Sequence, residues 1–226
     1  MSTCNIIRET KNPKILVVTP LLPGHTVSKE TKKTLKRNEI GYVWITSEGE
    51  NNIPTNLEKG LDWYEEKFGS LPDYYMMIDR DIIAGRHLLD RLYSRLCTAI
   101  DKGTLFAFSY ASFEFKGHVN VKFPAVPYDP RRLMQSNYIS SNSMFYTKIA
   151  RDVGLVKDDK YKRLLDWAFL LKLLYHGYIG VQVPEVSFVA MSTDSDISAG
   201  SAEDYKLKHG RIHEDFVIPI LKKYAT

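Results

Sequence analysis

Residues 73–83 read Asp-Tyr-Tyr-Met-Met-Ile-Asp-Arg-Asp-Ile-Ile. The apolar run Tyr74–Ile78 is typical of a buried strand, and it stops at a carboxylate. Asp79 and Asp81 are two residues apart, so in an extended chain both side chains point to the same side. Two neighbouring carboxylates repel each other unless a positive charge lies between them. The pair therefore predicts a Mg²⁺ or Mn²⁺ site at the end of a strand, where open α/β sheets bind ligands.

Spacing alone leaves coincidence open as the alternative explanation of this Asp-x-Asp motif. A second one, Asp194-Ser195-Asp196, lies in residues 192–201, a segment rich in Ser and Gly that is expected to form a mobile loop. The first motif differs from the second because it follows an apolar strand. The rest of the chain favours the metal site at Asp79 and Asp81.

Composition indicates an ordinary globular protein. The 226 residues are 44% hydrophobic and 26% charged, which suits one α/β domain. A net charge of +4 without a basic block does not indicate a nucleic-acid partner. Cys4 and Cys97 lack metal-ligand spacing, which favours a reducing compartment. With neither a signal peptide nor an apolar run of ~18 residues, we expect no transmembrane segment and a cytoplasmic protein, free or at a membrane surface.

The order of apolar and polar segments predicts the architecture. Strands at 14–19, 42–46 and 74–78 alternate with helices at 28–38 and 54–68, a β-α-β-α-β pattern that predicts a parallel sheet with right-handed crossovers. Later elements are expected as follows: helix 87–100, strand 105–110, hairpin 113–123, loop 124–132, short strand 138–146, helix 161–175, strand 179–189 and helix 203–223. We therefore expect an α/β fold with a mostly parallel central sheet flanked by helices, and a smaller mixed β region.

Two further positions are candidates for chemistry. Asp166 is a charged residue near the start of an apolar helix, where it compensates the helix dipole, or forms a salt bridge with Arg163, or acts as a general base. His209 and His213 are four residues apart and share a helical face. Either they are solvated histidines or one of them, His213, completes the coordination of a metal held by Asp79 and Asp81.

The order of these features resembles that of the GT-A glycosyltransferases, especially the family-2-like members, over residues 14–190. The resemblance is carried by Thr19-Pro20 after the first strand, an acidic loop after the second, Asn56 on a capped helix, the Asp-x-Asp motif, and Asp166-Trp167 at a helix start. It implies one GT-A domain over residues 1–226, with a nucleotide-binding half at about 14–103 and an acceptor and catalytic half at about 104–226. It also implies roles for individual residues, which are donor binding by Thr19, Pro20, Glu48, Asn56, Asp79 and Arg80, metal binding by Asp79, Asp81 and His213, and general base catalysis by Asp166.

Three positions depart from the family-2 pattern. Pro20-Leu21-Leu22 stands where Pro-Tyr-Asn is usual, Glu48 replaces the usual Asp, and Leu165 precedes the base where another acid is usual. These departures leave the subfamily and the stereochemistry open.

The resemblance implies a metal-dependent enzyme with Mn²⁺ or Mg²⁺ as cofactor. It would transfer a sugar from a nucleoside-diphosphate sugar, here expected to be a UDP-sugar, to a hydroxyl of a glycan or other acceptor, with inversion. Two alternatives stay open. A sugar-phosphate nucleotidyltransferase shares the sheet but carries a Gly-rich, Arg-containing loop where this chain has residues 20–25. A non-catalytic sugar-nucleotide or glycan-binding module would bind the same ligands without turnover.

Overall fold

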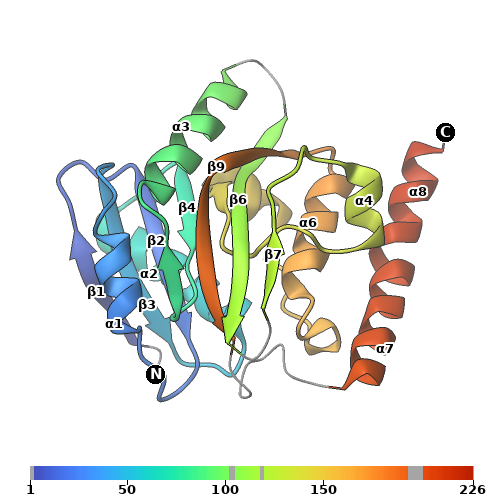
Figure 1. The fold of residues 1–226 in the computed structure, drawn as a ribbon, viewed down its shortest axis with the longest axis horizontal. Coiled ribbons are helices and arrows are strands. Elements are labelled where there is room, and N and C mark those ends of the chain that lie inside the picture. Colours follow the sequence, from blue (N-terminus) through green and yellow to red (C-terminus); the bar gives the residue numbers. More distant parts are fainter. Residues whose placement is uncertain (1–2, 102–104, 118–119, 193–200, 226) are drawn as a thin grey trace.

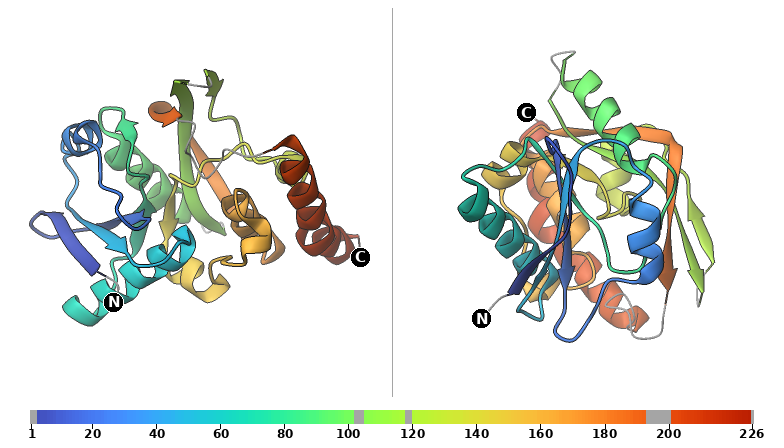
Figure 2. Two further views of the ribbon diagram at one scale, coloured as in Figure 1. Left: turned by 90° about the horizontal axis from the view of Figure 1, so that it is seen from below. Right: turned by 90° about the vertical axis from the view of Figure 1, so that its left-hand side faces the viewer.

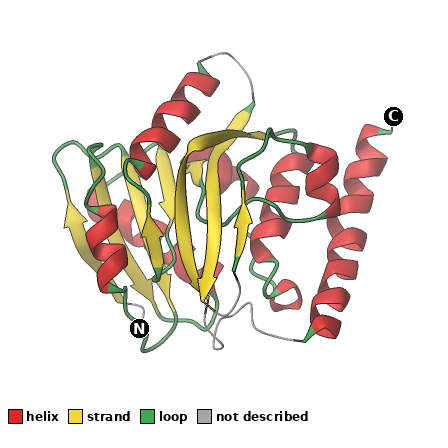
Figure 3. Cartoon of the chain, viewed as in Figure 1, coloured by secondary structure: helices red, strands yellow, loops and turns green. Residues whose placement is uncertain are grey.

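The computed structural model describes residues 3–101, 105–117, 120–192 and 201–225. Within these residues nine strands form one mixed sheet with helices on both faces (Figures 1 and 3). The strand order is β1-β3-β2-β4-β8-β6-β9-β5, and β7 pairs with β6. The elements are β1 Thr3–Glu9, β2 Ile15–Leu21, α1 Lys29–Leu35, β3 Tyr42–Glu48, α2 Ile53–Phe68, β4 Tyr74–Met77, β5 Ile82–Ala84, α3 Leu88–Ile100, β6 Phe106–Gly117, β7 Val121–Phe123, α4 Pro130–Gln135, β8 Met144–Tyr146, α5 Thr147–Val153, η1 Asp159–Tyr161, α6 Leu165–Tyr175, β9 Ile179–Ser192, α7 Ala202–Ile212, η2 His213–Val217 and α8 Ile218–Tyr224.

The predicted β-α-β-α-β unit is confirmed in the first half of the chain. β2 pairs in parallel with both β3 and β4, and α1 and α2 lie at the predicted positions. Every residue of β2 is buried. Along this strand Leu16 and Val18 belong to one core and Ile15 and Val17 to the other, which explains why its sequence is apolar without alternation.

The prediction of a mostly parallel sheet holds for only part of the molecule. Three of the strand pairings among the described residues are parallel, namely β2–β3, β2–β4 and β6–β9. Five are antiparallel, namely β1–β3, β4–β8, β5–β9, β6–β7 and β6–β8. The short strand β8 lies between β4 and β6 and is antiparallel to both, so it joins the two halves of a mixed sheet. A three-residue strand followed directly by a helix carries little periodicity from which direction could be predicted.

Several element boundaries differ from the prediction. Residues 3–9, for which the sequence predicted no element, form β1 on the edge of the sheet, where largely exposed strands have mixed composition. The strand and hairpin expected at 105–110 and 113–123 are one long strand, β6, paired with β7. Helix α4 occupies part of the expected loop 124–132. Most of the expected loop 192–201 lies outside the described residues.

Local capping explains where α2 begins and ends. The sequence Thr55-Asn56-Leu57-Glu58 has the Thr-x-x-Glu pattern of a capping box, which predicts Thr55 as the cap. In the structure Asn52 is the cap instead, because its Oδ1 accepts a hydrogen bond from Thr55 N at 3.0 Å. Gly69 follows the predicted helix 54–68 and ends it, with φ of 82°, a left-handed conformation that costs glycine little.

Helices cover the two faces of the sheet and build two cores. Figure 2 shows α2 on one side of the sheet and α1 and α3 on the other. The first core joins α2 and α6 to the sheet, and α8 packs onto α6 behind it. The second core joins α1 and α3 to the opposite face. In the described part of the chain, none of the helices combines the length and apolar character needed to cross a bilayer.

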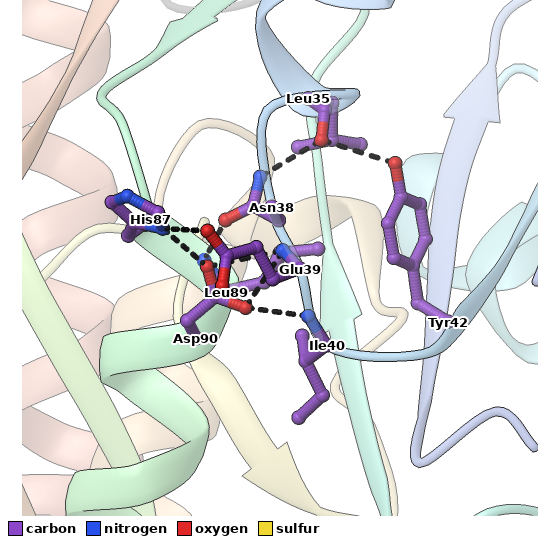
Figure 4. Close-up of polar contacts among 8 residues, drawn as sticks. All are labelled: Leu35, Asn38, Glu39, Ile40, Tyr42, His87, Leu89 and Asp90. Carbon is purple, nitrogen blue, oxygen red and sulfur yellow. Dashed lines mark hydrogen bonds and ion pairs between the residues drawn. The ribbon is translucent and has the colours of Figure 1, made fainter.

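A polar cluster on the second face fixes the turn between α1 and β3 to the start of α3 (Figure 4). The Asp90 carboxylate accepts hydrogen bonds from Glu39 N at 3.0 Å and Ile40 N at 2.6 Å, and it contacts His87 Nδ1 at 2.9 Å. Asn38 Oδ1 accepts from Leu89 N at 2.7 Å. Asn38 and Leu89 are buried and Ile40 is half-buried. Backbone donors that lose their partners at such positions destabilise the folded state, so the cluster is important for stability.

We expect Asp90→Ala to lower the free energy of unfolding by about 1–3 kcal/mol, because it leaves the Glu39 and Ile40 amides without their carboxylate acceptor. The measurement is equilibrium denaturation in urea. The matched control is Asp152→Ala, which removes a carboxylate that is 60% exposed and pairs with Lys148 in the i,i+4 position. Equal denaturation midpoints for the two variants would contradict the stabilising role of Asp90.

Candidate functional site

A pocket of about 340 Å³ lies where β2 and β4 end and α6 begins. Its lining brings together five of the residues expected from the sequence, which are Pro20, Asp79, Arg80, Asp81 and Asp166. Asp79 and Asp81 are separated from Asp166 by more than eighty residues in sequence. The sheet places them in one pocket because parallel strands end at a common edge and α6 begins there.

Asn142 holds Asp79 in place. The Asn142 side chain donates through Nδ2 to Asp79 Oδ2 at 2.7 Å and accepts from Asp79 N through Oδ1 at 2.8 Å. Asn142 is 2% exposed and lies just before β8. A buried amide that makes both contacts fixes the direction of the Asp79 carboxylate.

The backbone around Arg80 and Asp81 is also fixed. Arg80 O accepts hydrogen bonds from Ser28 N at 2.8 Å and Thr31 Oγ1 at 2.9 Å. Asp81 directly precedes β5, which pairs with β9. The two acidic residues are therefore carried on a segment held at both ends by strands, which suits a site that must keep its geometry.

Asp166 lies in the first turn of α6 and is partly buried. Its Oδ2 accepts from Asn137 Nδ2 at 2.9 Å, and its Oδ1 accepts from Trp167 N at 2.8 Å. Burial raises the pKa of Asp166 to about 6 from an ordinary value of 3.8, and the two hydrogen bonds offset part of that rise. A carboxylate with a pKa near 6 is well matched to accepting a proton at neutral pH.

Thr19, Glu48 and Asn56 do not line the pocket. Thr19 is fully buried, and its Oγ1 accepts from Trp44 Nε1 at 3.0 Å. Glu48 Oε1 accepts from Gly24 N at 2.9 Å. Asn56, also fully buried, donates to Leu21 O at 2.8 Å and to Glu50 O at 2.7 Å. These side chains shape the loops after β2 and β3 that border the pocket.

His213 lies at the junction of α7 and η2 and does not line the pocket. Its ring centroid is 4.7 Å from that of His209 and 6.1 Å from that of Trp167. Burial, and secondarily the neighbouring His209, lower the pKa of His213. Among the residues that the structure describes, no group of three or more His, Cys, Asp or Glu side chains is arranged to hold a metal ion. His213 is therefore not brought together with Asp79 and Asp81.

Two contacts of the acidic residues, with Asn137 and with Asn142, were not expected from the sequence, and Arg163, expected as a possible partner of Asp166, forms its ion pair with Asp204. Asn137 contacts Asp166 from 29 residues away, and Asn142 contacts Asp79 from 63 residues away. No local sequence pattern marks such distant partners. Arg163 lines the pocket with φ of 82°, and its Nη1 lies 3.5 Å from Asp204 Oδ2. A positive φ at a non-glycine residue beside Asp166 is the kind of backbone strain that gathers at functional sites.

Comparison with known proteins identifies the fold. No known family profile matches the chain, and no curated protein matches it in sequence. Among solved structures it is similar to the glycosyltransferase TarS of S. aureus, with a TM-score of 0.57 and 11% identity over 92% of this chain and 40% of TarS. TarS residues 1–349 in complex with UDP-GlcNAc give a TM-score of 0.58 and 12% identity, and the alignment covers 66% of that chain. The chain thus shares an α/β fold with TarS, and it spans less than two thirds of the length of these matched structures.

The raised pKa of Asp166 predicts a stability that depends on pH. Between about pH 4 and pH 6 the folded state holds this proton more tightly than the unfolded state, so the free energy of unfolding falls as pH rises through that window. Asp166→Asn removes the titrating group, and we expect its stability relative to the unmodified protein to rise over the same window and to level off above it. Urea denaturation at pH 4, 5, 6 and 7 measures this, with Asp152→Asn as the exposed control. Parallel pH curves for all three proteins would contradict the burial of a charged Asp166.

Proposed function

We propose that the protein is a glycosyltransferase that moves a sugar from a nucleoside-diphosphate sugar, a UDP-sugar, to a hydroxyl group of an acceptor. The observation that carries the proposal is the meeting of Asp79 and Asp81 with Asp166 in one pocket at the ends of the strands. The similarity in fold to TarS, solved with UDP-GlcNAc and with UDP, supports the choice of donor.

The acidic pair suits a divalent cation in the presence of the donor. Mg²⁺ and Mn²⁺ are commonly bound by one or two carboxylates together with substrate phosphates and water, so two carboxylates fit such an ion without a third protein ligand. In this proposal Asp79 and Asp81 hold the ion, which would neutralise the leaving diphosphate. Pro20 and Arg80 would contact the nucleotide, while Thr19, Glu48 and Asn56 support the loops around it.

Asp166 is the proposed general base. It accepts the proton of the acceptor hydroxyl while the acceptor oxygen forms a bond to the anomeric carbon of the donor sugar. The bond from that carbon to the diphosphate breaks on the opposite face, so configuration inverts. Asn137 Nδ2 and Trp167 N orient the Asp166 carboxylate, and its pKa of about 6 keeps it ionised at neutral pH.

We expect UDP to raise the melting temperature of the protein, and Mn²⁺ to increase that shift, because a ligand that binds only the folded state stabilises it. Asp81→Ala should abolish the Mn²⁺-dependent part of the shift. The control is Asp194→Ala, which alters the other Asp-x-Asp motif and should leave the shift unchanged. A UDP shift that EDTA and Asp81→Ala both leave intact would rule out the metal.

We expect Asp166→Asn to preserve the UDP shift while lowering the transfer rate ~10²–10⁴-fold, the usual contribution of a positioned base. In the unmodified protein the transfer rate should fall roughly tenfold for each pH unit below about 6, because only the ionised carboxylate accepts the proton. The measurement is release of UDP in the presence of acceptor across that pH range. Full transfer by Asp166→Asn would contradict the assignment, and binding without turnover in the unmodified protein would favour a binding module.

A further inference from the structure

Much of the pocket is apolar, although charged residues gather where the strands end. The six side chains that we call the apolar floor come from α2, β4, β8, α6 and the segment after α5. They are Leu57, Tyr75, Phe145, Leu155, Phe169 and Leu170. Tyr75 and Leu170 are each 1% exposed, so they form the buried base of the pocket.

The apolar floor continues the face of α6 that carries Asp166. Phe169 and Leu170 follow Asp166 by three and four residues, and side chains at these spacings are neighbours on one face of a helix. All three line the pocket. A molecule whose hydroxyl group reaches the Asp166 carboxylate would therefore have its adjoining atoms beside two apolar side chains.

The apolar floor is poorly suited to a sugar ring. Of its six side chains only Tyr75 carries a polar atom, and burial raises the pKa of that phenol, so it stays neutral. Every sugar hydroxyl that loses water without gaining a hydrogen-bond partner weakens binding. An apolar cavity of about 150 Å³ already binds a benzene ring, and this pocket is about 340 Å³. Size and lining therefore favour an apolar group over this surface.

We propose that the acceptor is an alcohol attached to an alkyl or aryl group, and that this group lies on the apolar floor while the hydroxyl faces Asp166. The inference rests on the proposed function, which it extends from a hydroxyl acceptor to an acceptor with an apolar body. A lipid-like chain and an aromatic aglycone share this chemistry.

Leu155 lies where the apolar floor borders a second pocket. Leu155 and Tyr75 also line a second, smaller pocket of about 60 Å³, whose other lining residues include Arg151 and Glu58. Leu155 is half-buried in the segment after α5, so its size can be changed with less risk to the core than that of Leu170. A larger side chain there should shorten the space for the acceptor, and a smaller one should lengthen it.

The test measures binding of methyl, phenyl and octyl β-glucoside by calorimetry in the presence of UDP, with octyl glucoside kept below its micelle-forming concentration. We expect phenyl or octyl glucoside, or both, to bind at least tenfold more tightly than methyl glucoside. A preference for the phenyl compound indicates an aromatic aglycone, and a preference for the octyl compound indicates a chain. Equal binding of all three would overturn the proposal.

Variants at Leu155 locate the site. We expect Leu155→Trp to weaken octyl glucoside binding at least tenfold without changing the UDP affinity, and Leu155→Ala to shift preference from the octyl to the decyl glucoside. The control is Leu207→Trp, which alters a leucine that is 56% exposed on α7 and should change neither ligand. Circular dichroism checks that each variant is folded, and Leu155→Ala keeps the test decisive if the tryptophan variant does not fold.

The remaining outcomes separate this inference from the proposed function. If Leu155→Trp weakens UDP binding and leaves octyl glucoside binding intact, the apolar floor takes the nucleotide base and the inference is wrong. If UDP does not bind but the apolar glucosides do, the donor assignment fails while the apolar preference stands. If UDP binds and no apolar preference is seen, the inference alone fails.

Discussion

The two hydrogen bonds between Asp79 and Asn142 connect the parts of the molecule on which the site depends. Asp79 follows β4, the last strand of the parallel unit, and Asn142 precedes β8, the strand that leads into the mixed half of the sheet. The backbone N–H and the carboxylate of Asp79 both form hydrogen bonds with the buried side-chain amide of Asn142. Because β8 lies between β4 and β6, this contact is made where the two halves of the sheet join, and it aligns the acidic pair with the second half.

The second half contributes the other side of the pocket at a cost in stability. Asp166 is carried by an apolar helix, and burial raises its pKa to about 6, which disfavours the charged form in the folded protein. Asn137 and Trp167 N reduce that cost without removing it. The acidic residues of the pocket can stabilise positive charge on a bound group, and the apolar floor excludes water from it. Electrostatic interactions are stronger where water is excluded.

The likeness to TarS at 12% identity indicates that the path of the backbone is shared while most contacts are built from other side chains. In this chain the loops after β2 and β3 are fixed by Asn56 and by the contact of Glu48 with Gly24. These residues occupy the positions that the family resemblance assigns to donor binding. Their hydrogen bonds to the backbone support a different contribution, which is to hold the loops that border the pocket.

The sequence by itself determined the parallel unit β2-α1-β3-α2-β4, the position of Asp79 and Asp81 at its edge, and Asp166 at a helix start, because local periodicity and strand ends encode these features. The tertiary structure alone decided the direction of β8, the edge strand β1, the partners Asn137 and Asn142, and the exclusion of His213 from the pocket. Each of these depends on contacts between residues far apart in the chain or on very short elements. Hydrophobic periodicity reports which face of an element is buried, but it does not report which distant element buries it.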